Sequence, residues 1–174
     1  MSDRIYNILF LSRDNAARSI MAEAYLNSRM HPRIRAFSAG GSPRGHINKT
    51  ALEVLAEAHI PTDNLRSKSW AEFLTSGARK MDLVIALCDW HVSEDCTAWP
   101  GKPATARWET PDPQLAEGSD VDKRHAFTET LAYLKLRLDF LRHFSAKQLE
   151  NLARLPQTDS NSQPAEFARK RVQL

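Results

Sequence analysis

Cysteine is scarce in this chain, with only Cys88 and Cys96 among 174 residues, so a disulfide-stapled secreted scaffold is excluded. No apolar run approaches the roughly 20 residues that a membrane-spanning helix needs. The first residues, Met-Ser-Asp-Arg, lack the apolar stretch of a secretory signal. We therefore expect a cytoplasmic protein that does not enter a membrane.

Paired histidines are also missing. The six histidines are scattered, without a spacing such as H-x-x-x-H that would place two of them on one helix face. We therefore predict no metal site and no other cofactor. The histidines are His31, His46, His59, His91, His125 and His143.

A strong charge of one sign is absent as well, because the net charge is only +3. Residues 156–174 are polar and contain a basic cluster, Arg169-Lys170-Arg171. We interpret them as a flexible tail behind a single domain of residues 1–155. The basic cluster fits a solvated chain end better than a nucleic-acid site, so we expect no nucleic-acid partner; a tail-dependent nucleic-acid accessory role is the weaker alternative.

What the sequence does contain is an alternation of strand and helix patterns. Short apolar runs predict strands, and periodic apolar stretches predict helices. One predicted helix ends before Pro32, and another starts after Asn48 and ends before Pro61. This order favours an α/β fold, a three-layer open sheet of about four parallel strands with helices on both faces. Strands are expected at 5–11, 34–39, 82–87 and 104–108, and helices at 16–31, 49–58, 69–74 and along the apolar stripe Phe127, Leu131, Leu134, Leu138 and Leu141.

In such a sheet, ligands bind beyond the carboxyl ends of the strands. The 12–19 loop, Cys88 and the turn Pro111-Asp112-Pro113 all fall at this edge. A short loop between strand and helix directs backbone N–H groups into one concavity, and the planar guanidinium of Arg18 can bind two oxygens of an anion there. The alternative is an ordinary helix start, with Asn15 as the cap and with Arg18 and Ser19 in solvent.

The stretch from Asn7 to Ala24, NILFLSRDNAARSIMAEA, resembles the signature segment of the low-molecular-weight protein tyrosine phosphatase superfamily, and more closely that of its arsenate reductase branch. The stretches Phe37–Gly40 and Leu65–Trp70 and the segment around Asp112 resemble further segments of that branch, in the same order. The resemblance spans about Asn7 to Phe144.

The resemblance implies an oxyanion site. It assigns the nucleophile to position 12, the clamp to Arg18 and the general acid to Asp112. Asn15 would brace the loop, and Ser19 would hydrogen-bond the nucleophile. The other loop residues, Arg13, Asp14, Ala16 and Ala17, would surround the anion.

The family's nucleophile is a cysteine, whereas this chain carries Ser12. A thiol near a helix N-terminus and an arginine ionises readily, but a hydroxyl needs an adjacent base, and no histidine is placed for that role. We therefore expect binding of phosphate or arsenate with impaired turnover. Ser12 is either an engineered change or natural divergence, and the second reading makes the chain a non-catalytic oxyanion- or phospho-ligand-binding protein.

In the arsenate reductase branch, two further cysteines follow the third strand. Cys88 and Cys96 match that arrangement, so the resemblance implies a redox relay served by a thioredoxin- or glutaredoxin-type reductant; two incidental thiols are the alternative. Gln114 and Leu115 follow the Asp-Pro pair where phosphotyrosine phosphatases carry aromatic residues. The resemblance thus favours a small inorganic anion over phosphotyrosine.

Overall fold

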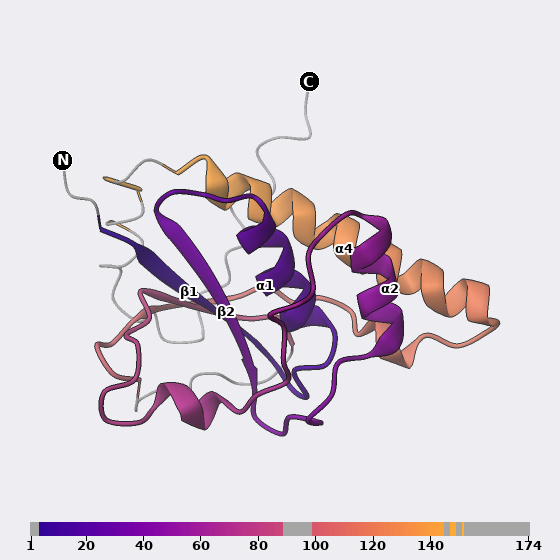
Figure 1. Cartoon of the computed structure of the whole chain (residues 1–174), viewed down its shortest axis with the longest axis horizontal. Coiled ribbons are helices and arrows are strands. Elements are labelled where there is room, and N and C mark those ends of the chain that lie inside the picture. The colour runs from indigo at the N-terminus through magenta and orange to yellow at the C-terminus, as the bar shows by residue number, and fades with distance from the viewer. Residues whose placement is uncertain (1–3, 89–98, 145–146, 149–150, 152–174) are drawn as a thin grey trace.

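The computed structural model describes residues 4–88, 99–144, 147–148 and 151, and within them the chain forms a four-stranded sheet in the order β2-β1-β3-β4 (Figure 1). All three strand pairs are parallel. The predicted α/β class with four parallel strands is therefore confirmed. The strands are β1 (Tyr6–Ser12), β2 (Ile34–Gly40), β3 (Leu83–Ala86) and β4 (Ala104–Arg107).

Both faces of the sheet are covered. The α-helices α1 (Arg18–Ser28), α2 (Lys49–Glu57) and α4 (Asp120–Arg142) share one apolar cluster with Ile8 and Phe10 of β1. The next residues along β1, Leu9 and Leu11, point to the opposite face and join a second cluster. That cluster includes Phe73 of the short 3-10 helix η1 (Trp70–Phe73), so among the described residues η1 packs on this face.

Local sequence signals explain the ends of the helices. The side chain of Asn48 accepts a hydrogen bond from the backbone of Thr50 at the start of α2, as predicted. Helix α4 starts with a capping box made by Ser119 and Asp122. Its predicted stripe of five apolar residues is at most 4% exposed, which confirms the assignment of this face to the core.

The strand order determines where a ligand can bind. The chain leaves β1 toward β2 on one side and returns to β3 on the other, so the switch point of the sheet, the crevice in which sheets of this kind bind ligands, lies at the carboxyl ends of β1 and β3. Ser12 ends β1 beside Gly40, and Leu11 lies beside Ala86 at the end of β3. The 12–19 loop therefore starts at this crevice.

The differences from the predicted elements are small. Helix α1 begins at Arg18 rather than near residue 16, because residues 12–17 are used for the loop. Cys96 and the predicted tail 156–174 lie outside the described residues. None of the helices in the described part is long and apolar enough to cross a membrane.

Candidate functional site

The 12–19 loop folds tightly against the end of β2. Asn15 adopts a left-handed backbone conformation with φ of 47°. The loop approaches Gly40 so closely that a Cβ added there would lie 2.9 Å from the backbone nitrogen of Asn15. Asparagine tolerates positive φ better than most residues, and glycine alone leaves the required space. Asn15 and Gly40 together therefore fix the course of the loop.

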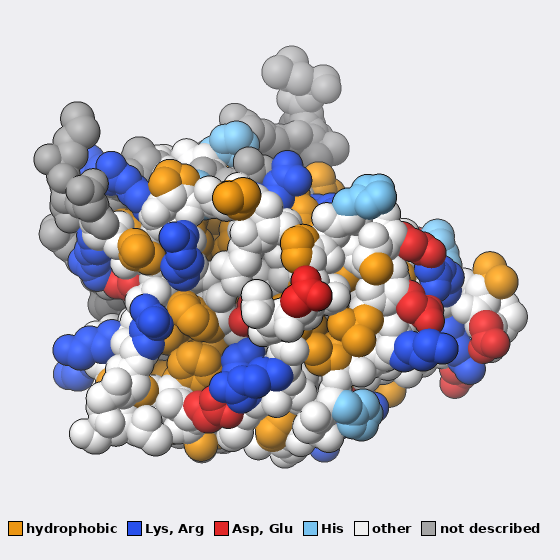
Figure 2. Space-filling view, in the orientation of Figure 1, with side chains coloured by type: hydrophobic (Ala, Val, Ile, Leu, Met, Phe, Trp, Pro, Cys, Tyr) orange, Lys and Arg blue, Asp and Glu red, His pale blue; other side chains and the backbone are white. Residues whose placement is uncertain are grey.

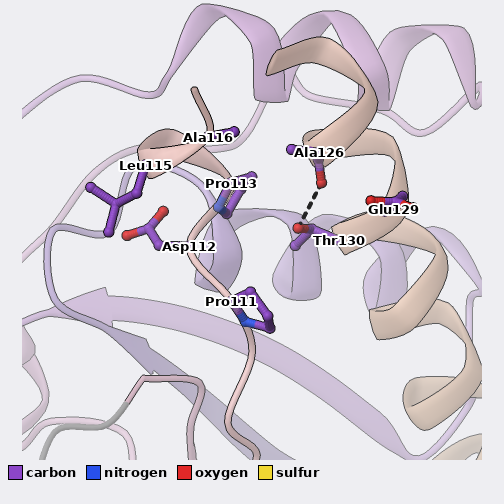
Figure 3. A pocket seen from close by; sticks show the side chains of 8 residues that line it. All are labelled: Pro111, Asp112, Pro113, Leu115, Ala116, Ala126, Glu129 and Thr130. Carbon is purple, nitrogen blue, oxygen red and sulfur yellow. Dashed lines mark hydrogen bonds between the residues drawn. The ribbon is translucent and has the colours of Figure 1, made fainter. Parts of the chain in front are cut away.

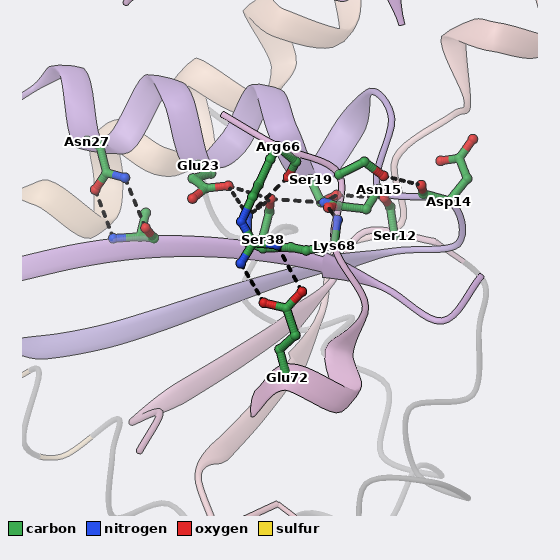
Figure 4. Close-up of polar contacts among 12 residues, drawn as sticks. Ser12, Asp14, Asn15, Ser19, Glu23, Asn27, Ser38, Arg66, Lys68 and Glu72 are labelled. Atoms are coloured by element: carbon green, nitrogen blue, oxygen red, sulfur yellow. Dashed lines mark hydrogen bonds and ion pairs between the residues drawn. The ribbon is translucent and has the colours of Figure 1, made fainter. Parts of the chain in front are cut away.

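Asn15 connects the loop to two neighbouring segments (Figure 4). The backbone N–H of Lys68 donates to Asn15 Oδ1 at 2.8 Å, which orients the side-chain amide. Asn15 Nδ2 then donates to Ser19 Oγ at 2.8 Å and to Ser38 Oγ at 2.9 Å. Asn15, Ser19 and Ser38 are all 0% exposed, so these hydrogen bonds are made out of contact with water.

The hydroxyl of Ser12 belongs to the same network. Ser12 Oγ lies 2.7 Å from Ser19 Oγ. Either hydroxyl can donate across this contact, and Ser19 Oγ also accepts from Asn15 Nδ2. Ser12 and Ser19 are both 0% exposed, so this contact is made out of reach of water.

A buried ion pair supports the network from behind. Ser38 donates a short hydrogen bond to Glu23, and Lys68 Nζ lies 3.2 Å from the same carboxylate oxygen. The side chains of Lys68 and Glu23 are 7% and 10% exposed. Removing one partner of such a pair leaves an uncompensated buried charge, so the pair resists disruption of the loop.

Arg18 reaches across the crevice from the first turn of α1. Its Nη1 donates to the carbonyl oxygens of Thr110 at 3.0 Å and Leu87 at 3.5 Å, and its Nη2 donates to Asp112 Oδ2 at 2.7 Å. The guanidinium is only 8% exposed and thus spans the loops that follow β3 and β4. It is held in place as a fixed positive charge at the sheet edge.

Asp112 starts the short 3-10 helix η3 (Pro113–Leu115) and caps it by accepting from the backbone N–H of Gln114. Figure 3 shows the Asp112 side chain pointing away from α4, whereas Pro113 lies between it and Thr130. A pocket of about 430 Å³ is formed on the α4 side of this turn. It is lined by Pro111, Asp112, Pro113, Leu115, Ala116, Ala126, Glu129 and Thr130.

Asp14 brings a second carboxylate to the site. Its Oδ1 accepts from the loop amide of Ala16 at 3.3 Å. Its Oδ2 accepts from Gln114 Nε2 at 2.9 Å and faces Arg44 Nε at 3.1 Å. A negative charge at this position opposes the approach of an anion and is only partly balanced by the half-exposed Arg44.

The alternative of a plain helix cap is wrong. The N-cap of α1 is Ala17, which provides no side-chain hydrogen bond, and Asn15 lies before it. Both Arg18 and Ser19 are buried rather than solvated, at 7% and 0% exposure. Of the remaining predicted loop residues, Ala16 is buried, and Arg13 is exposed.

Cys88 is buried as a free thiol just after β3, next to Leu87, whose carbonyl oxygen Arg18 contacts. Cys96 lies outside the described residues, so the predicted relay stays a prediction. Within the described ranges, no three His, Cys, Asp or Glu side chains are grouped so that they could hold a metal ion.

Arg66 and Glu72 form an ion pair whose pKa values are shifted. The hydrogen bonds between Arg66 and Glu72 raise the pKa of the guanidinium and lower that of the carboxyl. Both side chains are largely exposed, so the pair contributes little to stability. Figure 2 shows acidic and basic side chains side by side on the face it presents.

Five residues of the site were given no role in it from the sequence. Ser38 and Lys68 lie in segments that carry the resemblance, but no role was assigned to them. Glu23 had a detectable signal, because a carboxylate within the apolar run of α1 needs a buried partner. The two others, Arg44 and Gln114, have no sequence signal, since their contacts with Asp14 depend on how the loops meet.

Comparison with known proteins matches this arrangement to one family. Residues 7–153 match the family model described as low molecular weight phosphotyrosine protein phosphatase. An arsenate reductase from Halalkalibacterium halodurans is 32% identical over 120 residues, which cover 69% of this chain and 83% of that protein.

Solved structures share the fold. An arsenate reductase in the phosphate binding state has a TM-score of 0.64 at 22% identity and covers 83% of this chain and 99% of its own. A Cys-to-Ser mutant of the arginine phosphatase YwlE, with a phosphorylated active-site serine, has a TM-score of 0.62 at 27% identity. It covers 83% of this chain and 95% of its own. With a family model that spans most of the sequence, the chain belongs to the low molecular weight phosphotyrosine protein phosphatase family.

Proposed function

We propose that this protein binds a phosphate- or arsenate-like oxyanion in the 12–19 loop and that Ser12 prevents the turnover typical of the family. The observation that carries the proposal is the buried Arg18 guanidinium at the carboxyl edge of β1 and β3, next to a loop that the buried hydrogen bonds of Asn15 hold in place. Fixed N–H donors and a guanidinium are the groups that proteins use for tetrahedral anions.

The surroundings of Ser12 support binding over chemistry. When Ser19 donates to Ser12 Oγ, the Ser12 proton can bind an oxygen of the anion. Asp112 is engaged by Arg18, and no histidine lies among the described contacts of Ser12, so the hydroxyl has no adjacent base. Ser12 therefore acts as a hydrogen-bond donor to the ligand.

The enzymatic alternative remains a distinct proposal. With a thiol at position 12, the Ser19 hydroxyl and the start of α1 would stabilise a thiolate. That thiolate would attack phosphorus or arsenic, Arg18 would bind the equatorial oxygens, and Asp112 would protonate the leaving oxygen. An arsenate reductase would further need Cys88, Cys96 and a thioredoxin- or glutaredoxin-type reductant.

A third outcome is a single phosphoryl transfer. The YwlE mutant shows that a serine in a related active site can carry a phosphoryl group. In this chain, Ser12 Oγ would bond to phosphorus as the bond to the leaving oxygen breaks, and the Ser12 proton would end on the released alcohol. Hydrolysis of the resulting serine phosphate ester would have to expel an alkoxide, a poorer leaving group than a thiolate, so the protein would stay modified.

The test compares the chain as given with Ser12→Cys. Calorimetry measures the binding of phosphate and arsenate. Turnover is assayed with p-nitrophenyl phosphate and, separately, with arsenate plus a thiol-reducing system. Intact mass spectrometry detects modification of Ser12. We expect the unaltered chain to bind without sustained turnover, and Arg18→Ala to weaken binding about 100-fold because two charge-assisted hydrogen bonds are lost. Arg66→Ala, which removes an exposed guanidinium, is the matched control.

Turnover by Ser12→Cys alone would show that the rest of the catalytic machinery is intact, and the substrate that responds would identify the branch. Binding by both forms without turnover would favour the non-catalytic reading. Absence of binding in the unaltered chain would refute the proposed function.

A further inference from the structure

Gln114 joins two loops that belong to different strands. Its side-chain Nε2 donates to Asp14 Oδ2 at 2.9 Å and to Asp112 Oδ1 at 3.3 Å. Its backbone N–H donates to the same Asp112 oxygen at 3.1 Å. One residue thus bridges the carboxylate of the 12–19 loop and the carboxylate of the turn after β4.

The two oxygens of Asp112 are held from opposite sides. Gln114 engages Oδ1, and Arg18 engages Oδ2. The Asp14 end of the bridge is fixed in turn by the loop amide of Ala16 and by Arg44. Asp112 therefore cannot rotate away from Arg18 without breaking a connected set of hydrogen bonds.

We propose that Asp14 and Gln114 form a clasp that positions Asp112 on Arg18 as an internal competitor of the oxyanion. This inference rests on the proposed function, because the ligand must use the Arg18 guanidinium. An entering oxyanion takes hydrogen bonds that Asp112 now holds, and the clasp opposes the exchange. Asp14 and Gln114 are thus positioning residues that determine how tightly the site binds its ligand.

The clasp is first tested without any ligand, by amide hydrogen exchange. The backbone N–H of Leu115 donates to Asp112 O and that of Ala116 to Pro113 O, so both report on the turn that the clasp holds. We expect Gln114→Ala and Asp14→Ala to raise exchange at these amides about fivefold or more. Asp14→Asn keeps an oxygen that can accept from Gln114, so it is expected to leave exchange near the native rate.

The second arm measures the affinity for inorganic phosphate. Gln114→Ala carries no change of charge, so tighter binding, by about fivefold or more, would reflect the release of the carboxylates that Gln114 holds. Asp112→Asn removes the competing charge, so it gives the largest gain in phosphate affinity that the release of Asp112 can produce. Val121→Ala, at a side chain that is 76% exposed at the start of α4, is the matched control and should change neither readout.

Faster exchange together with tighter phosphate binding in Gln114→Ala supports the clasp. Native exchange in both alanine variants, or faster exchange with unchanged or weaker affinity, overturns it. If neither the unaltered chain nor Asp112→Asn binds phosphate, the proposed function and the competition both fail. The exchange rates then still decide whether the clasp holds the turn.

Discussion

Replacement of Asn15 by alanine is expected to destabilise the fold and to abolish anion binding. The variant loses three buried hydrogen bonds, from Lys68 N and to Ser19 and Ser38. Each is worth about 1 kcal/mol net, and the buried Lys68 N–H left without an acceptor adds about 1–3 kcal/mol. Alanine at a φ of 47° adds about 1 kcal/mol.

Allowing for overlap among these contributions, Asn15→Ala should lower the free energy of unfolding by about 3–5 kcal/mol. Asn15→Gly loses the same hydrogen bonds but adopts positive φ freely, so it should be about 1 kcal/mol less destabilised. Urea denaturation measures both values, and phosphate calorimetry on the folded variants measures the loss of binding.

Asn27 supplies a matched control. Its side chain makes two 2.9 Å hydrogen bonds to the backbone of Ala36, far along α1 from the loop. Asn27→Ala should destabilise the protein and leave phosphate affinity unchanged. A loss of unfolding free energy below about 1 kcal/mol in Asn15→Ala, or phosphate affinity that survives the substitution, would show that Asn15 does not hold the loop.

Three further results are expected. Lys68→Met should lower the free energy of unfolding by about 3–5 kcal/mol, because the Glu23 carboxylate then has no cationic partner in the interior. Adding Glu23→Gln should recover part of this loss. Strictly additive losses in the double variant, measured by urea denaturation, would contradict the coupling of the two residues. Gly40→Ala should lower the free energy of unfolding by about 1–3 kcal/mol, since the added Cβ would lie 2.9 Å from the backbone nitrogen of Asn15. An unchanged melting temperature would show that the loop moves to make room for the methyl group. Hydrogen bonds from Ser119 lower the pKa of Asp122, so this carboxylate stabilises the start of α4 above its unfolded-state pKa and stops doing so as the pH falls through the folded-state pKa. Carbon chemical shifts of the first turn should therefore move toward coil values in acid, and Ser119→Ala should remove most of that pH dependence.

Much of the fold was predictable because its signals are local. The apolar run in β1 and the alternation of strands with helices predicted the parallel sheet, and the stripe from Phe127 to Leu141 predicted the buried face of α4. The capping role of Asn48 also follows from its neighbours in sequence. Such features depend on residues a few positions apart, so a single sequence contains them.

The site was only partly predictable because its contacts are long-range. Arg18 and Asp112 could be placed at one sheet edge from topology, but their 2.7 Å ion pair joins residues 94 positions apart. The bridge from Gln114 to Asp14 spans 100 positions. Which loops meet at this edge depends on their lengths and on packing against the sheet, and no residue pattern records that.

The contact between Ser12 and Ser19 determines how much room a thiol at position 12 would have. The 2.7 Å separation between Ser12 Oγ and Ser19 Oγ is the usual length of a hydrogen bond between two hydroxyls. A sulfur atom has a larger radius, so a thiolate at position 12 would push Ser19 outward. Ser19 is fixed by Asn15, and Asn15 by Lys68, so this displacement strains the whole buried network. Low activity of Ser12→Cys would therefore have two distinct meanings. If Ser19→Ala raises that activity, crowding limited the thiolate; if it lowers the activity further, the Ser19 hydrogen bond was already stabilising the thiolate, and the limit lies elsewhere, at Arg18 and Asp112.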